Sequence, residues 1–118
     1  MSRPRILCLS YDDTVSEYRR KALGEGGYDV ITTTDPREAS RLLGIEQLDL
    51  LVIGHRFSVC QKKDLILQAK KFGPIPVLLV CGASSDSELA VDGRVYALQG
   101  TEGLLAGIAK LVPLTTAV

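Results

Sequence analysis

The stretch that decides the fold is DLLVIGHRF, Asp49 to Phe57. Its four consecutive aliphatic residues, Leu50 to Ile53, follow an acidic residue and precede a glycine, with no polar residue among them. Such an unbroken run is typical of a parallel strand covered on both faces, whereas a strand with one face in water alternates. The run therefore predicts a central strand of a parallel sheet, and Gly54 stands where that strand reaches the edge of the sheet.

Similar short aliphatic runs lie on either side of this stretch and are separated by longer segments with helical period. Parallel neighbours cannot be joined by a tight turn, so each intervening segment must be a crossover. The alternation predicts a small, doubly wound α/β domain with a three-layer αβα sandwich. The predicted strands are Arg5–Leu9, Asp29–Thr33, Asp49–Ile53, Pro76–Cys81 and Arg94–Leu98.

The first two crossovers carry helix signals with defined ends. The first helix stops at GEGG, whose glycines tolerate the left-handed backbone of a helix end. The second starts at Asp35, a capping residue, followed by Pro36 at the first helical position. The residues predicted to face the sheet are Val15, Tyr18, Ala22 and Leu23 in the first helix, and Ala39, Leu42 and Leu43 in the second.

The third helix is predicted over Cys60–Phe72, with an apolar inner face and a solvated outer face of lysines. Its inward residues are Leu65, Ile66, Ala69 and Phe72, and its outward residues are Lys62, Lys63, Lys70 and Lys71. The fourth crossover, GASSDSELAVDG, is short and polar, with room for two to three helical turns. A last helix is expected near Thr101–Val112.

Composition narrows the functional classes. The 118 residues are 46% hydrophobic, so one domain with a single large core is expected over residues 1–118. Fourteen basic residues balance fourteen acidic ones, so no overall field draws in nucleic acid or an anionic membrane. Three cysteines without a C-x-x-C pair and a single histidine favour reduced thiols over a metal site. No apolar run approaches about 18 residues, so we expect a cytoplasmic protein with no metal and no cofactor.

The framework resembles the response-regulator receiver domain of bacterial phosphorelay systems. The resemblance extends from Arg5 to about Val112 and rests on RILCLSYDD, GGYDVITTTDPREASRLL, QLDLLVIG, IPVLLV and YALQG with their spacing. It implies the flavodoxin-like (CheY-like) order of a five-stranded parallel sheet and a role in two-component signal transduction. Receivers of this family carry an acidic pair after the first strand and a phosphate-accepting aspartate at the end of the third. A hydroxyl residue ends their fourth strand, and a lysine followed by proline ends the fifth.

Carried over position by position, the resemblance implies a degenerate phosphorylation site. The corresponding residues are Ser10 and Tyr11 for the acidic pair, with Asp12 immediately beyond, Gly54 for the acceptor, Cys81 for the hydroxyl and Gln99 for the lysine. Phosphoryl transfer needs an oxygen nucleophile and a divalent cation, and glycine has no side chain to supply the first. Sliding the alignment so that Asp12 and Asp13 become the acidic pair leaves Gly54 unchanged. We therefore predict a pseudo-receiver that is not an enzyme.

The last helix points to a protein partner. In TEGLLAGIAKLV, apolar residues cover more of the helix circumference than packing on one sheet requires. We expect a homodimer through this helix, because a few buried aliphatic and aromatic residues usually carry the affinity of an interface. The predicted interface residues are Tyr96, which occupies the family's aromatic switch position, with Leu104, Leu105 and Ile108.

Two alternatives stay open at this stage. The vacated sheet rim could serve a small-molecule or redox sensor, with His55, Cys81, Gln99 and Asp12 around a pocket. A residual phosphorelay receiver is the other alternative, in which a neighbouring aspartate accepts the phosphoryl group.

Overall fold

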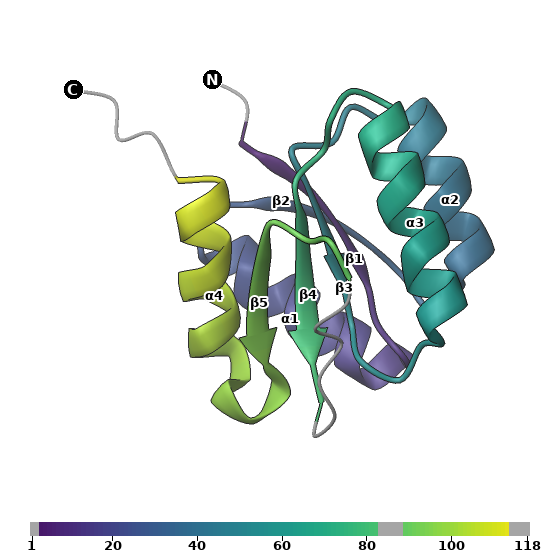
Figure 1. The fold of residues 1–118 in the computed structure, drawn as a ribbon. Coiled ribbons are helices and arrows are strands. Elements are labelled where there is room, and N and C mark those ends of the chain that lie inside the picture. Colours follow the sequence, from purple (N-terminus) through teal and green to yellow (C-terminus); the bar gives the residue numbers. More distant parts are fainter. Residues whose placement is uncertain (1–2, 83–88, 114–118) are drawn as a thin grey trace.

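The chain folds into one parallel sheet with helices on both faces (Figure 1). A computed structural model describes residues 3–82 and 89–113. Within these residues the strand order is β2-β1-β3-β4-β5, and every neighbouring pair is parallel. The strands are β1 (Arg5–Leu9), β2 (Asp29–Thr33), β3 (Leu50–Ile53), β4 (Val77–Cys81) and β5 (Gly93–Tyr96). The predicted doubly wound fold with flavodoxin-like strand order is therefore confirmed.

Four α-helices lie in the described residues. They are α1 (Asp13–Glu25), α2 (Pro36–Ile45), α3 (Val59–Lys71) and α4 (Gly100–Leu111), and a short 3-10 turn, Ala97–Gln99, joins β5 to α4. The predicted cap of α2 is confirmed, because the Asp35 carboxylate accepts a hydrogen bond from the backbone N–H of Arg37. The helical turns expected in the fourth crossover fall on residues 83–88, outside the described residues. None of the four helices has the length and apolar character that a membrane crossing needs.

Two apolar layers hold the sandwich together, one on each face of the sheet. The residues of β3 are all fully buried and alternate between the layers, because successive strand side chains point to opposite faces. Leu51 and Ile53 pack in the layer under α2 and α3, while Leu50 and Val52 pack in the layer under α1 and α4. Each such aliphatic side chain contributes roughly 1.5–3 kcal/mol by leaving water.

The sheet-facing side of α1 differs from the predicted one. Of the predicted residues, Leu23 is buried, Val15 and Ala22 are partly buried, and Tyr18 is 64% exposed. Besides Leu23, α1 buries Ser16 and Arg19. These three residues are spaced by three and four positions and so share one side of the helix. The prediction was wrong because it took the apolar residues as the buried ones, whereas the packing of α1 places an arginine against the sheet.

The predicted exposure of two residues in α3 was also wrong. Lys62 is buried, although the lysines were predicted to face water. It precedes Leu65 by three residues and therefore shares the sheet-facing side of the helix. Phe72 is exposed, because it lies at the carboxyl-terminal cap, beyond the last helical turn.

Candidate functional site

The predicted site lies at the carboxyl ends of β1 and β3, where ligands bind in doubly wound folds. Ser10 and Gly54 directly follow these two strands, and both are buried. Strand alternation places them on the face of the sheet that α1 and α4 cover. The backbone N–H of Gly54 donates a hydrogen bond of 2.7 Å to the carbonyl oxygen of Leu9, which fixes the two strand ends beside each other.

A cationic side chain occupies the space in front of Gly54. A Cβ atom at Gly54 would lie 3.1 Å from Nη1 of Arg19 and 2.8 Å from the carbonyl oxygen of Leu9. The same Nη1 donates a hydrogen bond of 3.3 Å to the Ser10 hydroxyl. Arg19 reaches this position from α1 and is only 9% exposed. A guanidinium therefore lies where a side chain at position 54 would begin.

A cluster of ring contacts lies directly after the two strand ends. Tyr11 comes after Ser10 and His55 comes after Gly54, and their rings meet edge to face with centroids 5.0 Å apart. The guanidinium carbon of Arg56 lies 4.5 Å from the centroid of the Tyr11 ring, a cation–π contact. Two of the predicted site positions are thus occupied by groups that pack on each other at the rim.

Three basic side chains lie near His55 at this rim. The pKa of His55 lies below its ordinary value of 6.5, first because the imidazole is partly buried and then because Arg19, Arg56 and Lys62 lie near it. In the described residues, no group of three or more histidine, cysteine or acidic side chains is placed to hold a metal ion.

The lowered pKa of His55 gives the domain a pH-dependent stability. Below about pH 6.5, His55 becomes protonated in the unfolded chain but stays neutral in the folded chain until a lower pH. The free energy of unfolding therefore falls as the pH drops from that value. We expect denaturant unfolding of the wild type between about pH 5 and pH 8 to show this loss, and His55→Gln to reduce it. Parallel pH profiles for the two proteins would contradict the prediction.

The remaining predicted site residues serve local structure or lie in the core. Asp12 caps α1, its carboxylate accepting a hydrogen bond of 2.8 Å from the backbone N–H of Val15. Gln99 is exposed, and its side-chain oxygen accepts a hydrogen bond of 3.0 Å from the backbone N–H of Tyr96. Cys81 is buried. The five most prominent hollows formed by the described residues have neither Ser10 nor Cys81 in their walls.

Sequence reasoning missed the two buried cations, Arg19 and Lys62. A helix position three residues from an apolar core residue was the available signal, since Lys62 has this relation to Leu65. Long basic side chains usually sit outside, which outweighed the spacing. Only the three-dimensional packing brings Arg19 to Ser10 and Gly54.

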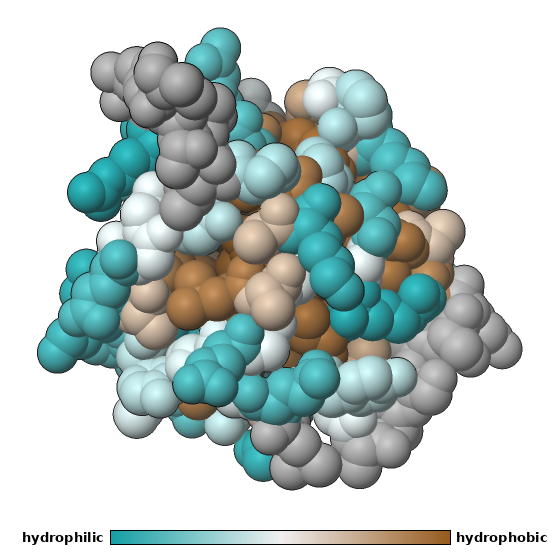
Figure 2. All heavy atoms as spheres, turned by 90° about the vertical axis from the view of Figure 1, so that its left-hand side faces the viewer, coloured by the Kyte–Doolittle hydropathy of each residue, from teal (hydrophilic) through white to brown (hydrophobic). Residues whose placement is uncertain are grey.

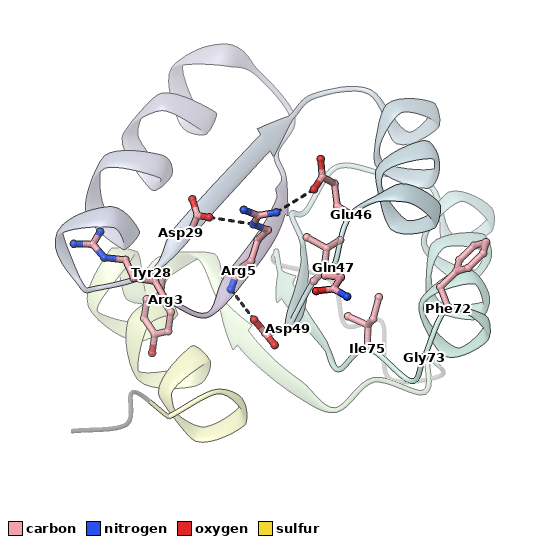
Figure 3. A pocket seen from close by; sticks show the side chains of 11 residues that line it. Arg3, Arg5, Tyr28, Asp29, Glu46, Gln47, Asp49, Phe72, Gly73 and Ile75 are labelled. Atoms are coloured by element: carbon pink, nitrogen blue, oxygen red, sulfur yellow. Dashed lines mark hydrogen bonds and ion pairs between the residues drawn. The ribbon is translucent and has the colours of Figure 1, made fainter. Parts of the chain in front are cut away.

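The largest of these five hollows lies at the opposite edge, around the amino ends of the strands (Figure 3). Its volume is about 820 Å³, and Arg5 is its central residue. The Arg5 side chain pairs with Asp29 and Glu46, each at 3.0 Å, and its backbone N–H donates to Asp49 at 2.8 Å. These contacts tie β1 to its neighbours, and exposed ion pairs contribute about 0–1 kcal/mol each. We interpret this hollow as a structural feature.

The predicted interface residues divide into two groups. Tyr96 is 56% exposed and Leu105 is partly buried, whereas Leu104 and Ile108 are buried in the core that α4 forms with the sheet. The assignment of Leu104 and Ile108 to an interface was therefore wrong. The reason is a close approach of α4 to β5, since a Cβ atom at Gly107 would lie 2.4 Å from Val95 Cγ1.

Comparison with known proteins supports the fold. No family model matches the sequence, and no curated protein matches it. Solved receiver structures do resemble it. Chemotaxis protein CheY4 of Vibrio cholerae is 17% identical with a TM-score of 0.79, covering 94% of this chain and 100% of its own. A CheY-like receiver domain from Methanospirillum hungatei JF-1 is 20% identical with a TM-score of 0.81, covering 92% and 93%. A receiver protein from Sinorhizobium medicae WSM419 is 16% identical with a TM-score of 0.82, covering 92% and 94%. The chain therefore has the fold of CheY-like response-regulator receiver domains.

Proposed function

We propose that this protein is a pseudo-receiver, a receiver-like domain of cytoplasmic signal transduction that acts as a protein-interaction module without being phosphorylated. The observation that carries the proposal is the pair of Gly54 and Arg19. Gly54 lacks the acceptor side chain, and Arg19 places a guanidinium 3.1 Å from where the Cβ atom of that side chain would lie. The fold likeness to receivers supplies the signalling context.

The chemistry of phosphoryl transfer explains why this pair is decisive. The reaction needs an in-line oxygen nucleophile and a divalent cation that neutralises the developing charge. Gly54 has no side-chain oxygen, three cations, Arg19, Arg56 and Lys62, act on neighbouring His55, and the carboxylate of Asp12 is engaged as the cap of α1. Position 54 supplies no nucleophile, and the described residues gather no acidic cluster that could hold the cation, so the domain is proposed not to be an enzyme of this class.

Incubation with acetyl phosphate and Mg²⁺ tests the proposal, with intact mass as the readout. We expect the mass of the chain to stay unchanged, while a phosphorylatable receiver treated in parallel gains one phosphoryl group. A stable adduct that peptide mapping assigns to Asp12 or Asp13 would favour a residual phosphorelay receiver and would overturn the pseudo-receiver reading.

We also propose that the partner is a second copy of the chain, bound through what we call the α4 face: Tyr96, Leu105, Ala106 and Ala109. Figure 2 shows this side of the molecule, where apolar residues gather within a ring of hydrophilic ones. Tyr96, Ala106 and Ala109 are exposed, and β5 is an edge strand of the sheet, the kind of strand on which a second chain can pair. Light scattering that gave the mass of one chain for the wild type would contradict this proposal.

A further inference from the structure

A second hollow lies between α1 and α4, over the carboxyl-terminal halves of β4 and β5. Its volume is about 270 Å³, and apolar residues form most of its wall, among them Val80, Val95 and Leu104. It differs from the rim that sequence reasoning considered for a sensor, because neither His55, Cys81, Gln99 nor Asp12 lines it. The hollow is slightly smaller than the roughly 300–1,000 Å³ of typical small-molecule sites, so it fits a ligand of about one ring.

Arg19 gives this apolar hollow a charged wall. It lines the hollow and is 9% exposed, and its partners among the described residues are two neutral groups, the hydroxyl of Ser10 and the thiol of Cys8, whose pKa is raised by burial. A guanidinium has five N–H donors, and a buried charge without an anion is unfavourable. The hollow therefore combines an apolar floor with a cation that lacks an anionic partner in the described part of the chain.

Two exposed tyrosines flank the hollow from different elements. Tyr18 of α1 is 64% exposed and Tyr96 of β5 is 56% exposed, and both line the hollow. Exposed aromatic rings beside an apolar recess provide surfaces on which a flat ligand can stack.

We propose that this hollow binds a small carboxylic acid with an apolar body, such as a monocyclic aromatic acid. The carboxylate pairs with the Arg19 guanidinium, whose planar fork matches a carboxylate, and the body packs on Val80, Val95 and Leu104. Inorganic phosphate is disfavoured, because losing its hydration in an apolar recess is costly. The inference goes beyond the proposed function and shares only Arg19 with it. Ligand binding and phosphorylation are measured separately, so either can fail while the other stands.

Titration of the ¹⁵N-labelled protein with benzoate tests the inference. We expect benzoate to shift the backbone amides of Val15, Val80, Val95 and Ala97, which line the hollow. Benzamide, which has the same shape without the charge, is expected to bind at least about tenfold more weakly, because a hydrogen bond to a charged group contributes about 1.5–3 kcal/mol. Inorganic phosphate is expected to leave these amides unshifted. Equal binding of benzoate and benzamide, tighter binding of phosphate, or no binding of benzoate would each overturn the inference.

Three variants identify the residues responsible. Arg19→Gln is expected to bring the affinity for benzoate down to that for benzamide, and Lys21→Gln, which removes an exposed cation from the same helix, is expected to leave it unchanged. Val15→Phe places a ring in the hollow from partly buried Val15 and is expected to abolish binding. Because removing Arg19 could disturb the fold, the Val15 variant provides an independent test. Wild-type affinity for benzoate in either Arg19→Gln or Val15→Phe would contradict the assignment.

Discussion

Replacing Ile108 with aspartate is expected to unfold the domain, not to separate a dimer. Ile108 is 0% exposed and packs in the layer between α4 and the sheet. The substitution removes an aliphatic side chain from the core and buries an unpaired carboxylate, which together cost more than about 4 kcal/mol. Domains of this size have only about 5–15 kcal/mol of stability. Circular dichroism and denaturant unfolding of the variant would measure the loss.

The neighbouring residue provides a matched control. Ala109 is exposed on the same helix, so Ala109→Asp is expected to keep the fold and to lose at most about 1 kcal/mol of helix stability. Because Ala109 belongs to the proposed α4 face, its aspartate variant is also expected to lower the native mass to that of one chain. A folded, monomeric Ile108→Asp protein would show that Ile108 lies in an interface after all.

Gly54→Ala is the substitution with the second-largest expected effect. The added Cβ atom would lie 2.8 Å from the Leu9 carbonyl oxygen, a backbone atom of β1 that cannot move without shifting the strand. Overpacking of this kind costs about 1–3 kcal/mol, so the denaturant midpoint is expected to fall. Gly24→Ala in α1 is the control, because nothing lies within 4 Å of its added Cβ atom. It is expected to leave stability unchanged or to raise it by up to about 1 kcal/mol.

Gly54→Asp tests whether a carboxylate at position 54 is by itself enough for phosphorylation. The Cβ atom of the new aspartate would meet the same backbone atom and would lie 3.1 Å from Arg19 Nη1. We expect the carboxylate to pair with the guanidinium and to remain unmodified by acetyl phosphate and Mg²⁺, because the described residues gather no acidic cluster that could hold the metal ion beside it. Equal midpoints for Gly54→Ala and the wild type would contradict the packing on which both expectations depend.

The fold could be predicted because local patterns specify it. The unbroken apolar run of Leu50 to Ile53 requires cover on both faces, and the cap at Asp35 marks the start of α2 independently of any distant contact. The absence of a side chain after the central strand was equally visible, since residue 54 is glycine. These features depend on residues close together in the sequence.

The side chains that meet at the candidate site could not be predicted in the same way. Arg19 and Gly54 are far apart in the sequence, and only the docking of α1 on the sheet brings the guanidinium beside the glycine. The rotation of α1 that buries Arg19 also exposes Tyr18, against the order that hydrophobicity alone suggests. Likewise, the apolar residues of α4 did not reveal which of them face the sheet.

By itself the sequence determined the parallel αβα architecture and the absence of a side chain at position 54, where the central strand ends. The tertiary structure alone decided that a buried arginine fills the space at that position and that Leu104 and Ile108 belong to the core. The physical reason is that periodicity and capping act between near neighbours, whereas the close approach of α4 through Gly107 and the reach of Arg19 depend on how whole elements pack.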